Sequence, residues 1–168
     1  VKQYGTDYIE LDCPGEEILL QFSGSPTVPV LPISSGDNHF MWSNRADGSV
    51  TRLGREFDLT GVSAPITLHY ETWYDLEVDY DYVYLLASID GENWQIISTP
   101  SCSRQNVSGN NYGCGYNGYS GGWIEQEVDL SAYAGKKVTL SFEYVTDEAV
   151  TAEGFLLDNI QLDALNYQ

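Results

Sequence analysis

The chain has 168 residues, and 7 Lys and Arg against 25 Asp and Glu give it a formal net charge of −18. This negative field repels phosphate backbones and anionic lipid surfaces, which argues against nucleic-acid and membrane partners. With 42% hydrophobic residues the chain can bury a substantial core, and we expect a single domain over residues 1–168. It begins at Val1 without a basic or apolar leader, and its many Tyr, Gly, Asn and Ser residues are typical of extracellular β domains. We therefore expect a piece of a longer protein that is secreted or held at the cell surface.

Alternation of apolar and polar residues with a period of two predicts β-strands through most of the chain. The run 82–89 is apolar on both faces, which predicts a strand in the middle of a sheet, and Asp90 and Gly91 predict a hairpin after it. A short helical turn is expected only at residues 129–133. Many short strands between Gly, Pro and Asn turns predict an all-β fold, an antiparallel two-sheet sandwich of the jelly-roll type. The predicted strands are residues 8–11, 18–22, 39–43, 52–58, 66–71, 82–89, 94–97, 124–129, 137–145 and 155–162.

One run of the sequence, residues 73–82, places a carboxylate at every second position: Asp75, Glu77, Asp79 and Asp81. In an extended chain these side chains share one face, about 7 Å apart, and repel one another unless the face is wet, the chain bends or a cation lies among them. A hard cation, calcium above all, is one interpretation. A solvated acidic edge that discourages pairing between sheets is the other. The EF-hand is excluded, because Tyr80 and Leu86 occupy the positions of its Gly and bidentate Glu.

The cysteines allow one local bridge. Cys102 and Cys114 flank a stretch rich in Gly and Asn, and a disulfide there would add about 3 kcal/mol of stability by closing the loop. Cys13 would then be left over. The alternative is three unpaired thiols, and metal binding by cysteine is not expected because the sequence has no C-x-x-C pair.

No catalytic motif is present in the sequence. A zinc peptidase needs two His one helical turn apart with a Glu beside them, and His39 and His69 have no such context. We therefore expect no enzymatic activity from this chain itself. Residues 110–123 interleave aromatic rings with Gly and Asn, which suits stacking on a sugar and makes a carbohydrate-binding module the alternative function. The same rings could instead fold onto the sandwich. The aromatic residues concerned are Tyr112, Tyr116, Tyr119 and Trp123.

Several segments together resemble a known family. They are residues 41–47, 73–77, 80–82, 88–94, 128–136, 144–147 and 154–160. In order and spacing they resemble the β-sandwich domain that follows the protease domain in the immune inhibitor A family of secreted bacterial zinc metallopeptidases. More distantly they are similar to MAM-like, galactose-binding-like and cleaved-adhesin jelly rolls. The resemblance covers roughly residues 40–162, and the loop between Cys102 and Cys114 departs from it.

The resemblance implies a secreted, calcium-stabilised jelly roll that supports or targets a peptidase and is not itself catalytic. Its partners would be the other domains of the parent chain, and a glycan or an extracellular protein is a further possibility. In adhesin-type relatives an acidic residue that opens the central strand and an Asp of the last strand bind calcium. The matching positions here are Asp81 and Asp158, and Glu77 and Asp47 are further candidates from the same motifs.

Overall fold

The computed structural model describes residues 8–11, 15, 19–27, 29–33 and 39–167. The chain divides into two units, Val1–Gly36 and Asp37–Gln168. No helix among the described residues is long and apolar enough to cross a membrane. Short 3-10 helices, η1 (Ser131–Tyr133) and η2 (Asp163–Leu165), follow β6 and β8. The strands all belong to the second unit: β1 (Met41–Trp42), β2 (Val50–Asp58), β3 (Thr67–Asp75), β4 (Tyr82–Ser88), β5 (Gln95–Ile97), β6 (Ile124–Asp129), β7 (Lys137–Val145) and β8 (Gly154–Leu162).

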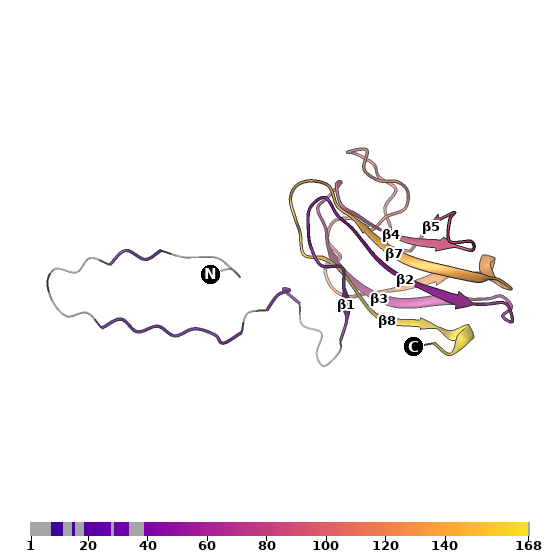
Figure 1. The fold of residues 1–168 in the computed structure, drawn as a ribbon, viewed down its shortest axis with the longest axis horizontal. Coiled ribbons are helices and arrows are strands. Elements are labelled where there is room, and N and C mark those ends of the chain that lie inside the picture. Colours follow the sequence, from indigo (N-terminus) through magenta and orange to yellow (C-terminus); the bar gives the residue numbers. More distant parts are fainter. Residues whose placement is uncertain (1–7, 12–14, 16–18, 28, 34–38, 168) are drawn as a thin grey trace. The chain divides into compact units, whose positions relative to one another are not determined.

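The strands form two four-stranded sheets in which every neighbouring pair is antiparallel. The first sheet has the order β1-β8-β3-β6 and the second has the order β2-β7-β4-β5. Figure 1 shows β2, β7 and β4 side by side, with β3 and β8 in the other layer. The chain changes sheet at every connection except the β4–β5 hairpin. This interleaving of eight strands is a jelly roll, so the predicted fold is confirmed.

Most of the predicted strands are present within one to four residues of their expected ends, and β6 and β7 match the predicted bounds. The apolar run 82–88 is an inner strand between β7 and β5, as expected. Two predictions are wrong, those of strands at residues 8–11 and 18–22: residues 8–11 and 19–22 have no strand conformation, and residue 18 lies outside the described part of the chain. A segment with a period-two pattern forms a strand only where a neighbouring strand pairs with its backbone. The alternation itself does not provide that neighbour.

The inner faces of the two sheets enclose a core with an aromatic centre. Tyr70 packs edge-on against Phe142 with ring centroids 5.0 Å apart, and Tyr116 packs against Phe155 at 5.4 Å. The hydroxyl groups of Tyr70 and Tyr116 lie 2.5 Å apart, and Tyr116 also donates to Oε1 of Gln126 across 3.1 Å. The buried polar atoms of the rings are therefore paired within the core, as burial requires.

Candidate metal centre

The acidic run bends instead of continuing as a strand. β3 ends at Asp75 and β4 begins at Tyr82, and the chain between them makes a turn in which Asp79 has a φ of 70°. The backbone N–H of Asp81 donates to the carbonyl oxygen of Glu77 across 3.2 Å. Of the three ways to relieve the repulsion that the sequence left open, a wet face, a bend and a bound cation, the structure shows the bend, so the four carboxylates do not share one extended face.

Asn117 holds this turn. Its side-chain amide donates to the carbonyl oxygens of Glu77 (3.0 Å) and Asp81 (2.8 Å), and its oxygen accepts from the backbone N–H of Asp79 (3.1 Å). The three hydrogen bonds fix both ends of the turn and its left-handed residue. Asn117 lies in the loop before β6, so a residue distant in sequence sets the local conformation of the acidic run.

The turn brings Glu77 and Asp81 together with a third carboxylate, that of Asp147. One oxygen from each of the three lies within 4.8 Å of the others. The strand register explains the third member: Tyr82 of β4 pairs with Val145 of β7, so the residues before β4 and after β7 meet at one end of the second sheet. Three carboxylates this close repel one another, and a metal ion bound among them would offset that repulsion. Carboxylate oxygens are also the ligands that hard cations prefer, so the arrangement can hold a metal ion.

The surroundings make these charges costly in the absence of a cation. Burial raises the pKa of Glu77, and the charges of Asp147 and Asp81 raise it further. Burial also raises the pKa of Asp81, although the backbone N–H of Asp147 and the Tyr144 hydroxyl, each 3.1 Å away, donate hydrogen bonds that oppose the shift. Burial, followed by the Asp81 charge, raises the pKa of Tyr144 well above its usual value, so that hydroxyl stays protonated and donates.

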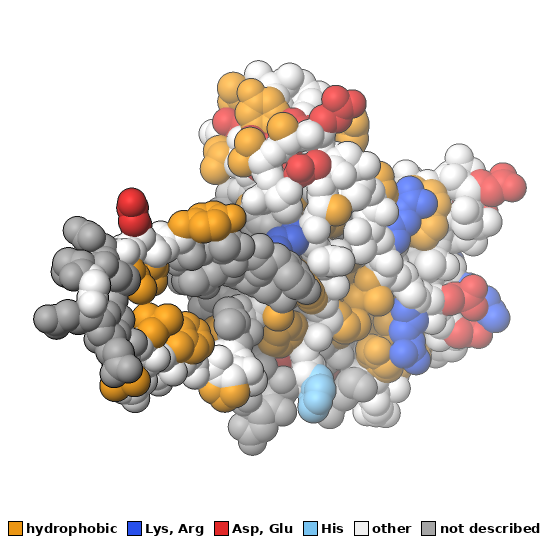
Figure 2. All heavy atoms as spheres, turned by 60° about the vertical axis from the view of Figure 1, so that its left-hand side comes forward, with side chains coloured by type: hydrophobic (Ala, Val, Ile, Leu, Met, Phe, Trp, Pro, Cys, Tyr) orange, Lys and Arg blue, Asp and Glu red, His pale blue; other side chains and the backbone are white. Residues whose placement is uncertain are grey.

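The donor set fits a hard cation. Asp81 is 1% exposed, and Oε2 of Glu77 is buried without a hydrogen-bond partner among the described residues. No Lys or Arg in the described part of the chain forms an ion pair with the three carboxylates. On the face shown in Figure 2, acidic side chains stand at the surface in separate small groups. Proximity and burial therefore distinguish this acidic group from the general negative charge of the protein.

The other two predicted metal ligands lie outside the group. Asp47 is exposed and accepts a hydrogen bond from the Thr151 hydroxyl, although its charge adds to the raised pKa of both Glu77 and Asp81. Asp158 lies on β8 opposite Glu71 in the first sheet. The resemblance implied that Asp81 and Asp158 bind calcium, but the residue of β8 that pairs with Asp75, at the start of the acidic turn, is Gly154.

Sequence reasoning assigned no role to Asp147 or Asn117. Asp147 lies two residues after the end of a well-predicted strand and within the segment 144–147 that resembles the family, and these are the signals that could have pointed to it. No sequence signal identifies Asn117 within a loop that contains several other Asn residues.

The four aromatic residues of the predicted sugar-binding loop have separate surroundings. Tyr116 is only 1% exposed and belongs to the core, so its ring is closed to a ligand. Tyr119 is 65% exposed and lies edge-on to Trp73, while Trp123 contacts the ring of Phe40. Tyr112, 72% exposed, lies against Tyr84 instead. The four rings therefore do not form one binding face.

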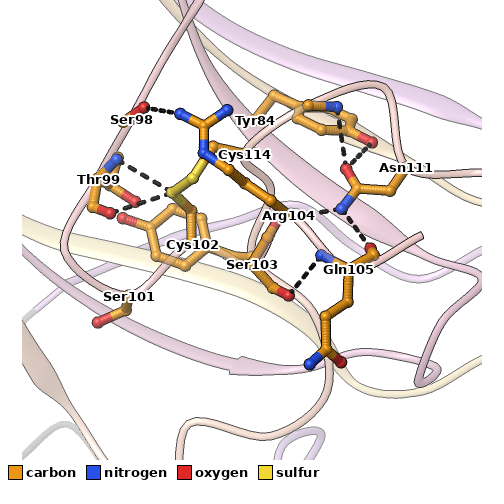
Figure 3. The surroundings of a disulfide bond; sticks show 12 residues. Tyr84, Ser98, Thr99, Ser101, Cys102, Ser103, Arg104, Gln105, Asn111 and Cys114 are labelled. Carbon is orange, nitrogen blue, oxygen red and sulfur yellow. Dashed lines mark hydrogen bonds between the residues drawn. A yellow bond between two sulfur atoms is a disulfide. The ribbon is translucent and has the colours of Figure 1, made fainter. Parts of the chain in front are cut away.

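A disulfide joins Cys102 to Cys114, the pair expected from the sequence, with their Cα atoms 5.1 Å apart. Figure 3 shows this bridge together with the Asn111 side chain, which donates to the carbonyl oxygens of Ser103 (3.0 Å) and Gln105 (2.7 Å). The bridge and the amide thus brace the loop at two places. Cys13, which was predicted to be left over, lies outside the described residues.

The topology and the acidic group together define a jelly-roll β-sandwich domain with a candidate cation site at one end. Comparison with known sequences assigns the family, because the sequence model described as "Immune inhibitor A-like, MAM domain" matches residues 23–166. The chain belongs to this family, as the resemblance in the sequence indicated.

Three relatives illustrate the contexts in which such a sequence occurs. The pre-pro-metalloprotease PrtV of Vibrio cholerae is 31% identical over 122 residues, which cover 73% of this chain and 13% of that protein. Immune inhibitor A of Bacillus thuringiensis subsp. alesti is 32% identical over 124 residues, 73% of this chain and 17% of the relative. Bacillopeptidase F of Bacillus subtilis is 31% identical over 101 residues, 60% of this chain and 6% of the relative. The chain thus spans less than a fifth of each relative.

Proposed function

We propose that this chain is a non-catalytic, calcium-stabilised accessory domain of a larger secreted peptidase. The observation that carries the proposal is the acidic group of Glu77, Asp81 and Asp147, with a buried carboxylate oxygen that has no hydrogen-bond partner among the described residues. Family membership supports the accessory role, since two of the relatives are named as a protease and a peptidase and the chain matches only a small part of each. The partners would then be the other domains of the parent chain.

Calcium suits this group better than magnesium does. Calcium accepts six to eight oxygen ligands in flexible geometry, whereas magnesium requires a near-ideal octahedron and releases its water reluctantly. The three carboxylates come from different segments, two from the β3–β4 turn and one from the β7–β8 connection, and no single loop shapes them into a rigid cage. A bound cation would link these segments and remove the repulsion that they bear without it.

Thermal unfolding with excess calcium, with excess magnesium and after chelation tests the proposal. Calcium at a hundred times its dissociation constant adds about 2.7 kcal/mol, which corresponds to a rise in Tm of about 5–10 °C for a domain of this size. We expect this rise for calcium, a smaller one for magnesium, and none in Asp147→Asn or Asp81→Asn.

Asp158→Asn is the matched control, because it removes one carboxylate that lies outside the acidic group. It should retain the full calcium response. If calcium leaves the Tm of the unmodified chain unchanged, or if Asp158→Asn abolishes the response while Asp147→Asn retains it, the proposed site is wrong.

A further inference from the structure

The outer face of the second sheet carries a pocket of about 250 Å³, apart from the acidic group. Phe142 and Leu85 pair across β7 and β4 and point into the core, so the residues on either side of them in these strands point outward. Ser141 is one of these, and it pairs with Gly54 of β2 and Leu86 of β4. Gly54 has no side chain and the neighbouring Ser141 has a small one, so the sheet surface is hollow there.

Aromatic side chains flank this hollow. Trp94 and Tyr112 both line the pocket. Trp94 lies in the hairpin before β5 and is 42% exposed, and Tyr112 lies in the disulfide-closed loop and is 72% exposed. Trp94 and Tyr112 are therefore both exposed at one depression, and grouped apolar surface with a polar rim is typical of a ligand-binding groove.

The loop that carries Tyr112 is held against the sheet. The backbone N–H of Tyr112 donates to the Tyr84 hydroxyl across 3.0 Å, and the two rings lie 6.1 Å apart. A Cβ added at Gly113 would lie 2.7 Å from the Ile96 side chain, which shows how closely the loop backbone approaches β5. Figure 3 shows Tyr84 of β4 beside the Asn111 amide of the braced loop, and the Tyr84 hydroxyl donates to Oδ1 of Asn111 across 3.3 Å. The pocket wall is thus positioned before any ligand arrives.

The polar groups of the pocket form a balanced set. Arg52 of β2 makes an ion pair with Glu143 of β7, so the pair contributes no net charge. Arg52 offers N–H donors, Glu143 offers acceptor oxygens, and the Ser141 hydroxyl can do either. Such a set can satisfy hydroxyl groups, which both donate and accept. The overall charge of −18 opposes anionic ligands.

We propose that this pocket binds a sugar unit of a neutral oligosaccharide. A pyranose ring carries an apolar face of C–H groups, which packs on the electron-rich faces of Trp94 and Tyr112, and a rim of hydroxyls, which the Arg52–Glu143 pair can bind. A purely apolar ligand would displace water from the remaining N–H donors of Arg52 and offer them no hydrogen-bond acceptor. Sugar binding therefore uses only Tyr112 of the aromatic loop residues, and adds Trp94 and the sheet face.

Native gel electrophoresis of the chain in gels that contain a neutral polysaccharide tests the proposal. Hydroxyethylcellulose, xylan, galactomannan and glycol chitin are the probes, and alginate is the anionic comparison. We expect at least one neutral polysaccharide to slow the chain and alginate to have no effect. Trp94→Ala and Tyr112→Ala should each weaken the retardation by about tenfold or more in polysaccharide concentration.

Tyr119→Ala is the matched control, since it removes an exposed Tyr that lies outside the pocket. It should retain binding, and so should Asp147→Asn, which separates this proposal from the cation site. The Tm of each variant, measured alongside, shows whether it is folded. The proposal is overturned if none of the four neutral polysaccharides slows the unmodified chain, or if folded Trp94→Ala and Tyr112→Ala bind as it does.

Discussion

The backbone N–H of Asp147 donates a hydrogen bond of 3.1 Å to Oδ1 of Asp81, although 66 residues separate the two in the chain. This bond joins the β7–β8 connection to the start of β4 and also brings the Asp147 carboxylate toward that of Asp81. The backbone thus holds together two side chains that repel each other. Because the repulsion between the two carboxylates depends on their ionisation, a bound cation should change how the stability of the domain varies with pH.

Without calcium, stability should decrease as the pH rises through the raised pKa values of Glu77 and Asp81. The folded protein binds these protons more tightly than the unfolded chain does, so the contribution of the group is most favourable below the unfolded pKa values of about 4 and is lost above the folded ones. Urea unfolding between about pH 4 and about pH 7, with and without calcium, measures this. Calcium should flatten the dependence because it favours the ionised group.

Other carboxylates titrate in the same range, so the comparison needs a variant. Hydrogen bonds from neighbouring residues lower the pKa of Asp58, Asp90 and Asp129, and these groups give a slope of the opposite sign. The difference between the unmodified chain and a Glu77→Gln/Asp81→Asn double variant isolates the acidic group. A difference that does not change with pH would contradict the prediction.

Asn117→Ala should destabilise the domain by about 1–3 kcal/mol, because the three hydrogen bonds that the Asn117 amide makes to the backbone of the acidic turn are lost. It should also reduce the rise in Tm with calcium, since the turn no longer holds Glu77 and Asp81 in place. Ser108→Ala, which removes one hydrogen bond to the carbonyl of Asp79, is the milder control. Equal calcium responses in Asn117→Ala and the unmodified chain would show that the amide does not position the carboxylates.

Tyr116→Phe should cost about 1–3 kcal/mol, measured by urea unfolding, because Tyr70 loses the partner of its buried hydroxyl. The ring itself remains, so the aromatic packing is kept. Tyr119→Phe changes an exposed hydroxyl and should alter stability by less than about 0.5 kcal/mol. If the two substitutions had equal effects, the hydroxyl pair in the core would contribute nothing.

Removal of the disulfide in Cys102→Ala/Cys114→Ala should lower the free energy of unfolding by about 3 kcal/mol, through the entropy of the opened loop. A thiol assay checks the bridge directly. In a Cys13→Ser background, the denatured protein should show no reactive thiol before reduction and two after it, since the chain has three Cys. Two reactive thiols before reduction would show that the bridge is absent.

Local patterns were enough to predict much of the fold. The inner strand β4, the hairpin at Asp90 and the strand over Lys137–Val145 follow from alternation and turn residues within a few positions of one another. The same reasoning failed at residues 8–11 and 19–22, where the alternation is not accompanied by a hydrogen-bonded ladder. The sequence did identify Glu77 and Asp81 as members of an acidic group, because both belong to a short run with a carboxylate at every second position.

Tertiary structure decided which residues join that site. Asp147 lies beside Asp81 because Tyr82 pairs with Val145. Asp158 lies away from the acidic group because it pairs with Glu71 in the other sheet. The register between distant strands depends on the whole sandwich, and no pattern near either residue encodes it. Burial of the Tyr116 ring and exposure of the Tyr112 ring were settled in the same way. Both Tyr residues lie in the same loop and have similar neighbours in the sequence. Only the packing of that loop on the sheets distinguishes them.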